Sequence, residues 1–167
     1  MVRSIFSLAQ ICAIVLLAGL AALVHTANAA AVTCNNACKI AGSQAYVAAV
    51  ISHSDKDISR IPLTANVTRF EKLNGGSYAF SANGSKSLKD SLKFGTTAFF
   101  VTGSAEPDGG LGQYTVLKNG TVSSVYRLKA GLLGIGLAKT LVHERFDFTS
   151  DGLIYNITAE AVSPPPA

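Results

Sequence analysis

The chain has 167 residues, of which 49% are hydrophobic and 14% are charged, and its formal net charge is +4. The length fits one domain. The low charged fraction excludes an intrinsically disordered chain, which needs many charges and few apolar residues. The 15 glycines have no three-residue period, which excludes a collagen-like chain.

The N-terminal residues 1–29 are predicted to be a secretory signal peptide. Arg3 gives a positive start, residues 11–24 form an uncharged apolar run, and residues 27–29 (Ala-Asn-Ala) have the small-x-small pattern of a cleavage site. The apolar run is shorter than the ~20 residues that cross a bilayer, which disfavours a membrane anchor. We therefore expect a secreted, extracellular protein with one folded domain, residues 30–162.

Two cysteines remain after the signal peptide is removed. An exported chain meets an oxidising compartment, so Cys34 and Cys38 are predicted to form a disulfide at the start of the first helix. The alternative is two reduced thiols one helical turn apart. No metal site is expected, because His53 and His143 have no zinc-like spacing to the cysteines. No cofactor is expected either.

Four Asn-x-Ser/Thr triplets occur in the expected mature chain. In a eukaryotic secretory pathway they would be glycosylation sites, and the asparagines must then face solvent. Two of them are also Asn-Gly turn dipeptides, which is a sufficient structural explanation for those two. The four asparagines are Asn66, Asn83, Asn119 and Asn156.

The first half of the expected mature chain is predicted to be mainly helical. Asn35 or Asn36 can cap the first helix, Pro62 stops a short helical turn, and an Asn-Gly-Gly turn separates two short strands. The predicted elements, in chain order, are a helix at 35–52, a helical turn at 55–61, strands at 66–73 and 77–82, and a helix at 85–94.

After Gly95 the apolar pattern changes to a period of two, which is typical of strands. Short connections between consecutive strands favour antiparallel pairing. We therefore predict an α+β fold in which N-terminal helices pack on one face of a curved antiparallel sheet, and the space that they leave unfilled becomes a pocket. The predicted strands are 98–105, 111–117, 121–130, 138–149 and 153–161, and a disordered proline tail follows at 163–167.

This order of elements resembles the SnoaL-like branch of the nuclear transport factor two-like superfamily. Residues 45–74 carry most of the resemblance: a Tyr-Val-Ala-Ala helix is followed by Ile61-Pro62-Leu63, which leads into a strand. The resemblance implies a cone-shaped fold with a pocket at its wide end. Members include isomerases, hydrolases, cyclases and dehydratases as well as non-catalytic binding modules, so the fold leaves activity open. This chain has no clear aspartate–histidine dyad at matching places.

Three charged residues are the catalytic candidates. Arg69 and Glu71 share one face of a strand; if that face is inward, Glu71 is a general base beside Arg69. The alternative is a solvent-facing pair with Phe70 inward, and the large aromatic ring favours this alternative. Glu144 falls on the more apolar face of its strand, which makes it a candidate for acid–base chemistry. The other reading of Glu144 is a place near an open sheet edge.

Four further side chains are predicted to line the pocket. Tyr46 on the first helix and Tyr126 and Tyr155 on strands are expected to point inward, where simple core packing is their alternative role. His53 closes the first helix, either as a cation at the helix C-terminus or above the pocket mouth.

Strict alternation along the last strand predicts which of its residues point inward. Leu153, Tyr155 and Ile157 are expected to face the interior, and Ile154 and Asn156 to face away. An exposed Tyr155 would mean that this register is wrong.

Two classes of function are consistent with the sequence. The first is a secreted protein that binds a small apolar molecule, with or without turnover of the isomerase or hydrolase type. The second is a non-catalytic interaction protein, such as a host-directed effector, that binds a host protein. The apolar, glycine-interrupted residues 130–137 are a lid, a partner-binding patch or the one expected place of membrane contact, and a buried turn of the sheet is the alternative. No nucleic-acid partner is expected, and the sequence leaves a homodimer open.

Overall fold

The structure is a computed structural model that describes residues 33–94, 112–132 and 135–163. The predicted signal peptide, the predicted strand at 98–105 and the tail beyond residue 163 lie outside the described residues, as do the side chains of the apolar stretch 130–137. Within the described part, no helix is both long and apolar enough to cross a membrane.

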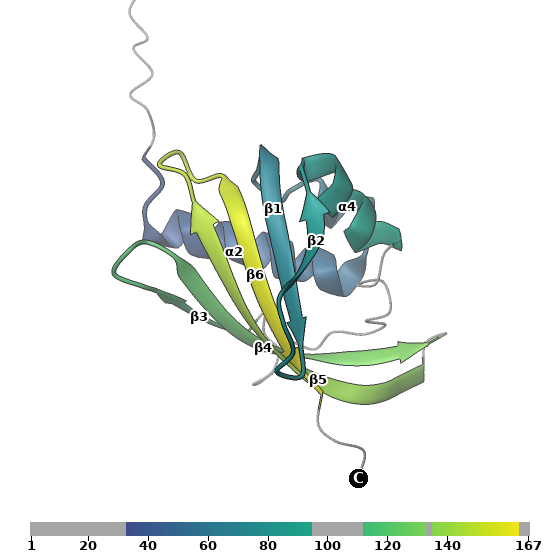
Figure 1. Ribbon diagram of the computed structural model, residues 1–167. Helices are drawn as coiled ribbons and strands as arrows, with labels where there is room; N and C mark the ends of the chain where they lie inside the picture. Colours follow the sequence, from purple (N-terminus) through teal and green to yellow (C-terminus); the bar gives the residue numbers. More distant parts are fainter. Residues whose placement is uncertain (1–32, 95–111, 133–134, 164–167) are drawn as a thin grey trace, which may run out of the picture. The chain divides into compact units, whose positions relative to one another are not determined.

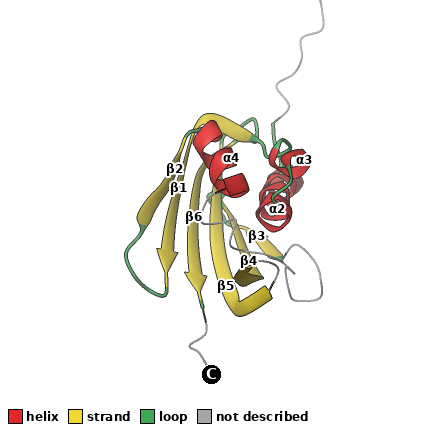
Figure 2. Ribbon diagram, turned by 90° about the vertical axis from the view of Figure 1, so that its right-hand side faces the viewer, coloured by secondary structure: helices red, strands yellow, loops and turns green. Residues whose placement is uncertain are grey.

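The described part of the domain consists of helices packed on one face of a single sheet. The helices are α2 (Asn36–Ser52), α3 (Asp55–Ile58) and α4 (Ser85–Phe94), and the strands are β1 (Leu63–Leu73), β2 (Ala79–Asn83), β3 (Gln113–Val116), β4 (Val122–Leu132), β5 (Ile135–Phe148) and β6 (Ile154–Val162). α2 contacts β3 and β4, and α4 contacts β1 and β2. Both helices lie on the same face of the sheet (Figures 1 and 2), which confirms the predicted α+β architecture.

The sheet is mixed, which corrects the prediction of a wholly antiparallel sheet. Its strand order is β2-β1-β6-β5-β4-β3. β1 and β6 run parallel, whereas the other neighbouring pairs are antiparallel. The rule that short connections give antiparallel pairs applies to consecutive strands. β1 and β6 are far apart in the chain, so the rule could not predict how they pair.

The start of α2 is anchored to the turn between β5 and β6. Asn35 caps the helix by accepting a hydrogen bond from the Cys38 backbone N–H at 3.0 Å. Cys34 and Cys38 form a disulfide, as predicted, and the Cys34 N–H donates to the Ser150 carbonyl at 3.1 Å. Gly152 has a φ of +87°, and a Cβ atom there would lie 2.6 Å from the Cys34 Cβ. Glycine therefore lets this turn lie against the disulfide.

The hydrophobic core lies between the helices and the inner face of the sheet. The ring of Tyr46 on α2 packs edge-to-face on Phe146 of β5, with 5.3 Å between the ring centroids. Leu88 and Leu92 of α4 are fully buried, as their i, i+4 spacing predicts. The fully buried residues also include Val47, Val67, Val122, Ile154 and Ile157.

Tyr155 is exposed, which contradicts its prediction as a pocket residue. Its exposed fraction is 47%. Asp147 of β5 pairs with Asn156, but the next residue of β5 pairs with Ile154, so Tyr155 is an extra residue without a partner on β5. This bulge breaks the alternation of the strand, and both Ile154 and Ile157 are buried. The inward position of Ile157 is confirmed, whereas Ile154 and Tyr155 were assigned to the wrong faces.

Candidate functional site

A cavity of about 130 Å³ lies on the inner face of the sheet. Its polar lining consists of Arg69, Glu71, Lys72 and Tyr126, and the rest of the wall is apolar. A mainly apolar wall with a few polar groups is typical of small-molecule sites, and an apolar cavity of about 150 Å³ holds a molecule such as benzene. The apolar residues of the wall are Val50, Leu73, Leu128, Val142, Ala159 and Ala161.

Arg69 and Glu71 face this cavity from β1. Only 6% of the Arg69 side chain and 25% of the Glu71 side chain are exposed, and Arg69 Nη1 forms an ion pair with Glu71 Oε1. Phe70 lies on the outer face, where its ring packs edge-to-face on Phe80 of β2 at 5.2 Å. The alternative that placed Phe70 inward is therefore wrong. The Phe80 ring on the neighbouring strand packs against Phe70, so this contact stabilises Phe70 on the outer face without burial in the core.

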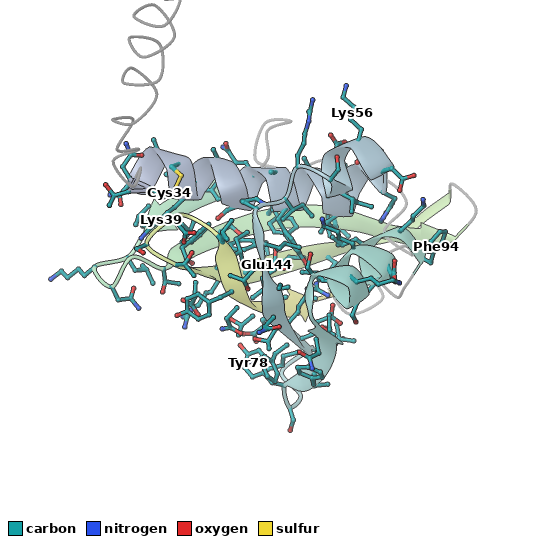
Figure 3. The ribbon with its side chains drawn as sticks, turned by 90° about the horizontal axis from the view of Figure 1, so that it is seen from above. Cys34, Lys39, Lys56, Tyr78, Phe94 and Glu144 are labelled. Atoms are coloured by element: carbon teal, nitrogen blue, oxygen red, sulfur yellow. A yellow bond between two sulfur atoms is a disulfide. The ribbon has the colours of Figure 1, made fainter. Side chains whose placement is uncertain are left out.

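Glu144 is completely buried in the middle of the sheet. Tyr126 Oη donates a hydrogen bond to Glu144 Oε2 at 2.6 Å, and Arg69 Nη2 lies 3.8 Å from Glu144 Oε1. β5 lies between β6 and β4, so the alternative place near an open edge is wrong, and Figure 3 shows Glu144 near the middle of the described domain. Burial raises the pKa of the Glu144 carboxyl, which the Arg69 charge and the Tyr126 hydrogen bond partly oppose.

Tyr46 reaches this cluster from α2. The Arg69 guanidinium lies over its ring, with 5.9 Å between Cζ and the ring centroid. Burial raises the pKa of Tyr46 and of Tyr126, and the Glu144 charge adds to this effect. Both phenols therefore stay protonated at neutral pH, and the Tyr126 hydroxyl donates to Glu144.

Four buried polar atoms of the cluster have no hydrogen-bond partner among the described residues. Buried polar atoms in proteins are nearly always paired, and an unpaired one costs about 1–3 kcal/mol. Their concentration around one carboxylate shows that the cluster has hydrogen-bonding capacity that its own side chains do not use. The four atoms are Tyr46 Oη, Arg69 Nε, Ser124 Oγ and Glu144 Oε1.

The structure brings five of the predicted site residues together. Arg69, Glu71 and Tyr126 line the cavity itself. Tyr46 and Glu144 were expected on the cavity wall, but they lie directly behind it and contact the wall through Arg69 and Tyr126. The cavity wall and the buried cluster therefore form one continuous site, in which Glu71 is the carboxylate that borders the cavity.

His53 lies away from this site. It is the C-cap of α2 with a left-handed φ of 53°, and its Nδ1 forms a hydrogen bond of 2.8 Å with the Leu92 carbonyl of α4. His53 therefore lies at the C-terminus of the helix and not among the residues that line the cavity. The structure therefore shows His53 as a residue that joins α2 to α4.

Sequence reasoning missed two residues beside Glu144. Ser124 lies directly opposite Glu144 on β4, and Tyr114 lies opposite Ser124 on β3. Burial, together with the Glu144 charge, raises the pKa of Tyr114. Alternation along residues 113–116 would have placed Tyr114 inward. That short strand contains no charged residue, so its sequence did not suggest a functional site. Among the described side chains, no three His, Cys, Asp or Glu converge as metal ligands do.

Solved structures show which proteins share this arrangement. A protein of the SnoaL-like family from Agrobacterium tumefaciens matches with a TM-score of 0.52 and 12% identity, over 75% of this chain and 97% of that chain. An NTF2-like protein from Anabaena variabilis matches with a TM-score of 0.51 and 16% identity, over 77% of this chain and 88% of that chain. The chain has the SnoaL-like, NTF2-like fold. The resemblance stated from residues 45–74 is thereby confirmed at the level of the fold.

No protein-family model and no curated protein matches the sequence. At identities of 12% and 16% the likeness concerns the fold alone, so the function of this chain has to be argued from its own site.

Proposed function

We propose that this protein binds a small, mainly apolar molecule in the cavity on the inner face of the sheet. The observation that carries the proposal is the contact between an apolar cavity wall and a buried polar cluster with unpaired hydrogen-bonding atoms. Apolar pockets with a few convergent polar groups are the usual sites for small ligands. The scaffold of the SnoaL-like fold is consistent with this use.

The two parts of the wall support different parts of a ligand. Val50, Leu128 and Val142 offer apolar contact, which stabilises a bound molecule by about 25 cal/mol for each Å² of apolar surface removed from water. Arg69 and Tyr126 offer polar contact at one side. A molecule with an apolar body and one polar group fits both.

Proton transfer is a second function that the wall supports. The Glu71 carboxylate borders the cavity, and the Arg69 guanidinium pairs with it. We propose Glu71 as the general base, whereas Glu144 is a positioning residue that holds the Tyr126 hydroxyl. Glu71→Gln would then abolish turnover of a bound molecule, whereas an uncharged probe such as benzene should still bind.

Filling the cavity tests the binding proposal. Ala161 lines the cavity, so Ala161→Leu is expected to weaken benzene binding by about tenfold or more, equivalent to about 1.4 kcal/mol. NMR titration of the purified protein with benzene measures this. Ala79 is exposed on β2, and Ala79→Leu is the matched control that should bind benzene like the native protein.

Two results would contradict the binding proposal: no saturable benzene binding to the native protein, or equal binding to Ala161→Leu. The second function class, a scaffold for a host protein, would then be the better explanation. The exposed side chains of Leu73, Tyr78 and Phe80 around the β1–β2 hairpin support that second class.

We also infer that the protein works outside the cytoplasm. The predicted signal peptide and the Cys34–Cys38 disulfide support this inference, because structural disulfides persist in oxidising compartments. The purified exported protein is expected to begin at Ala30.

Export through a eukaryotic secretory pathway is expected to place glycans on Asn66, Asn83 and Asn119 but not on Asn156. The first three are exposed. The Asn156 amide donates to Asp147 Oδ2 at 2.9 Å, and its Oδ1 accepts from Thr68 Oγ1 at 2.9 Å. A glycan on this amide would disrupt both contacts between strands. Peptide mapping before and after deglycosylation measures occupancy, and a largely occupied Asn156 in folded protein would contradict the prediction.

A further inference from the structure

The acidic and basic side chains that interact with one another beside the cavity are unequal in number. Among the described residues, four ionisable side chains other than the neutral phenols belong to the cavity and its buried cluster, and three of them interact with one another: Arg69, Glu71 and Glu144. Lys72 also contributes to the wall, but its ammonium pairs with Glu160 at 2.8 Å. Two carboxylates thus share one guanidinium.

Arg69 is already engaged by both carboxylates. Nη1 pairs with Glu71 and Nη2 lies 3.8 Å from Glu144, while the side chain is 6% exposed. An anionic ligand would bring further negative charge into this desolvated cluster, where an uncompensated charge is strongly unfavourable. The unpaired Arg69 Nε offers one hydrogen bond, but it adds no positive charge to balance that ligand.

We propose that the cavity selects small apolar amines, about one ring in size, that carry a single protonated amino group. This inference rests on the proposed function, because it names the class of molecule that the same cavity takes. The ammonium group would pair with the Glu71 carboxylate and lie near the ring of Tyr126, both of which line the cavity. The apolar part would contact Val50, Leu128 and Val142.

A cation bound in the cavity is expected to change the pKa of the Glu144 carboxyl. Burial raises the pKa of its carboxyl, so the group holds its proton more tightly than an exposed glutamate does. A cation bound beside the cluster stabilises the ionised carboxylate and lowers that pKa again. The side chains that face Glu144 from the neighbouring elements are Tyr46 of α2, Arg69 of β1, Tyr114 of β3, and Ser124 and Tyr126 of β4.

Three probes of the same ring size and different charge test the selectivity: benzylamine, benzyl alcohol and benzoate. Each is titrated into the purified protein near neutral pH, and NMR signals of cavity residues report binding. Benzylamine is expected to bind about tenfold more tightly than benzyl alcohol, and benzoate about tenfold more weakly. Benzyl alcohol or benzoate binding as tightly as benzylamine would overturn the inference.

A matched pair of variants locates the source of the preference. Glu71→Gln removes the cavity carboxylate and is expected to bring the dissociation constants of benzylamine and benzyl alcohol to within about threefold of each other. Asp90→Asn removes a carboxylate that also pairs with a cation, Lys86 at 2.6 Å, but on the exposed surface of α4 away from the cavity, and should keep the full preference. A preference that survives Glu71→Gln would overturn the inference.

The titrations distinguish a cavity that binds small molecules without preferring amines from a cavity that binds no small molecule. If none of the three probes shifts the signals of cavity residues such as Val142, the proposal of a small-molecule site fails as a whole. If benzyl alcohol binds and benzylamine binds no more tightly, the cavity is a binding site but its selectivity for amines is refuted.

Discussion

Arg69→Met is expected to lower the free energy of unfolding by about 3–5 kcal/mol, the cost of breaking a buried ion pair. Arg69 is the cation between Glu71 and Glu144, and its loss leaves a buried carboxylate without a counter-charge. Methionine keeps much of the length of the side chain, so lost packing contributes little. Urea denaturation near neutral pH measures the difference.

Two further variants separate charge from other effects. Adding Glu144→Gln to Arg69→Met should recover part of the lost stability, because the neutral amide removes the unpaired charge. The Arg60 side chain is 63% exposed and lies 3.8 Å from Asp57, so Arg60→Met is expected to change stability by less than about 0.5 kcal/mol. Equal losses for Arg60→Met and Arg69→Met would show that the buried cluster does not behave as an ion network.

Glu144→Gln alone is expected to change how stability depends on pH. Burial raises the pKa of Glu144 in the folded protein above its ordinary value in the unfolded chain. The stabilisation from this bound proton is complete below the unfolded-state pKa and is lost as pH rises through the folded-state pKa. The native protein should lose stability over that range, whereas the variant should not, because glutamine does not titrate.

Urea denaturation at a series of pH values above the ordinary glutamate pKa of about 4.3 measures this difference. Asp57 does not interfere, because hydrogen bonds from Ser52 and Ser54 lower its pKa and it titrates below this range. Glu160→Gln on the outer face should keep the pH dependence of the native protein. Parallel curves for the native protein and Glu144→Gln would mean that Glu144 does not titrate as its burial requires.

The parts of the fold that depend on local patterns could be predicted from the sequence. The bounds of α2 and α4 follow from helical periodicity and from the Asn35 cap. β3 to β6 follow from the period of two and from turn residues. The parallel pairing of β1 with β6 could not be predicted, because it depends on contacts between opposite ends of the domain.

Most residues of the candidate site could be predicted from the sequence, but which of them line the cavity could not. An acidic residue on an apolar strand face correctly marked Glu144 as a buried carboxylate. The outward alternative for Arg69 and Glu71 was favoured because the sequence does not show that Phe80, on another strand, covers Phe70. Tyr155 was misplaced because a bulge adds one residue without a sequence signature. The division between cavity wall and buried cluster depends on packing across four strands and a helix, which no local pattern encodes.

The position of β6 has a consequence for the order in which the chain can fold. β6 is the last strand in sequence, yet it is the only neighbour that joins β1 and β2 to β3, β4 and β5 within the described sheet. Before residues 154–162 are available, the sheet consists of two halves without a common partner. Contacts of such high sequence separation also form slowly. We therefore expect the sheet to close only after residues 154–162 have been synthesised, which delays folding until nearly the whole domain is available.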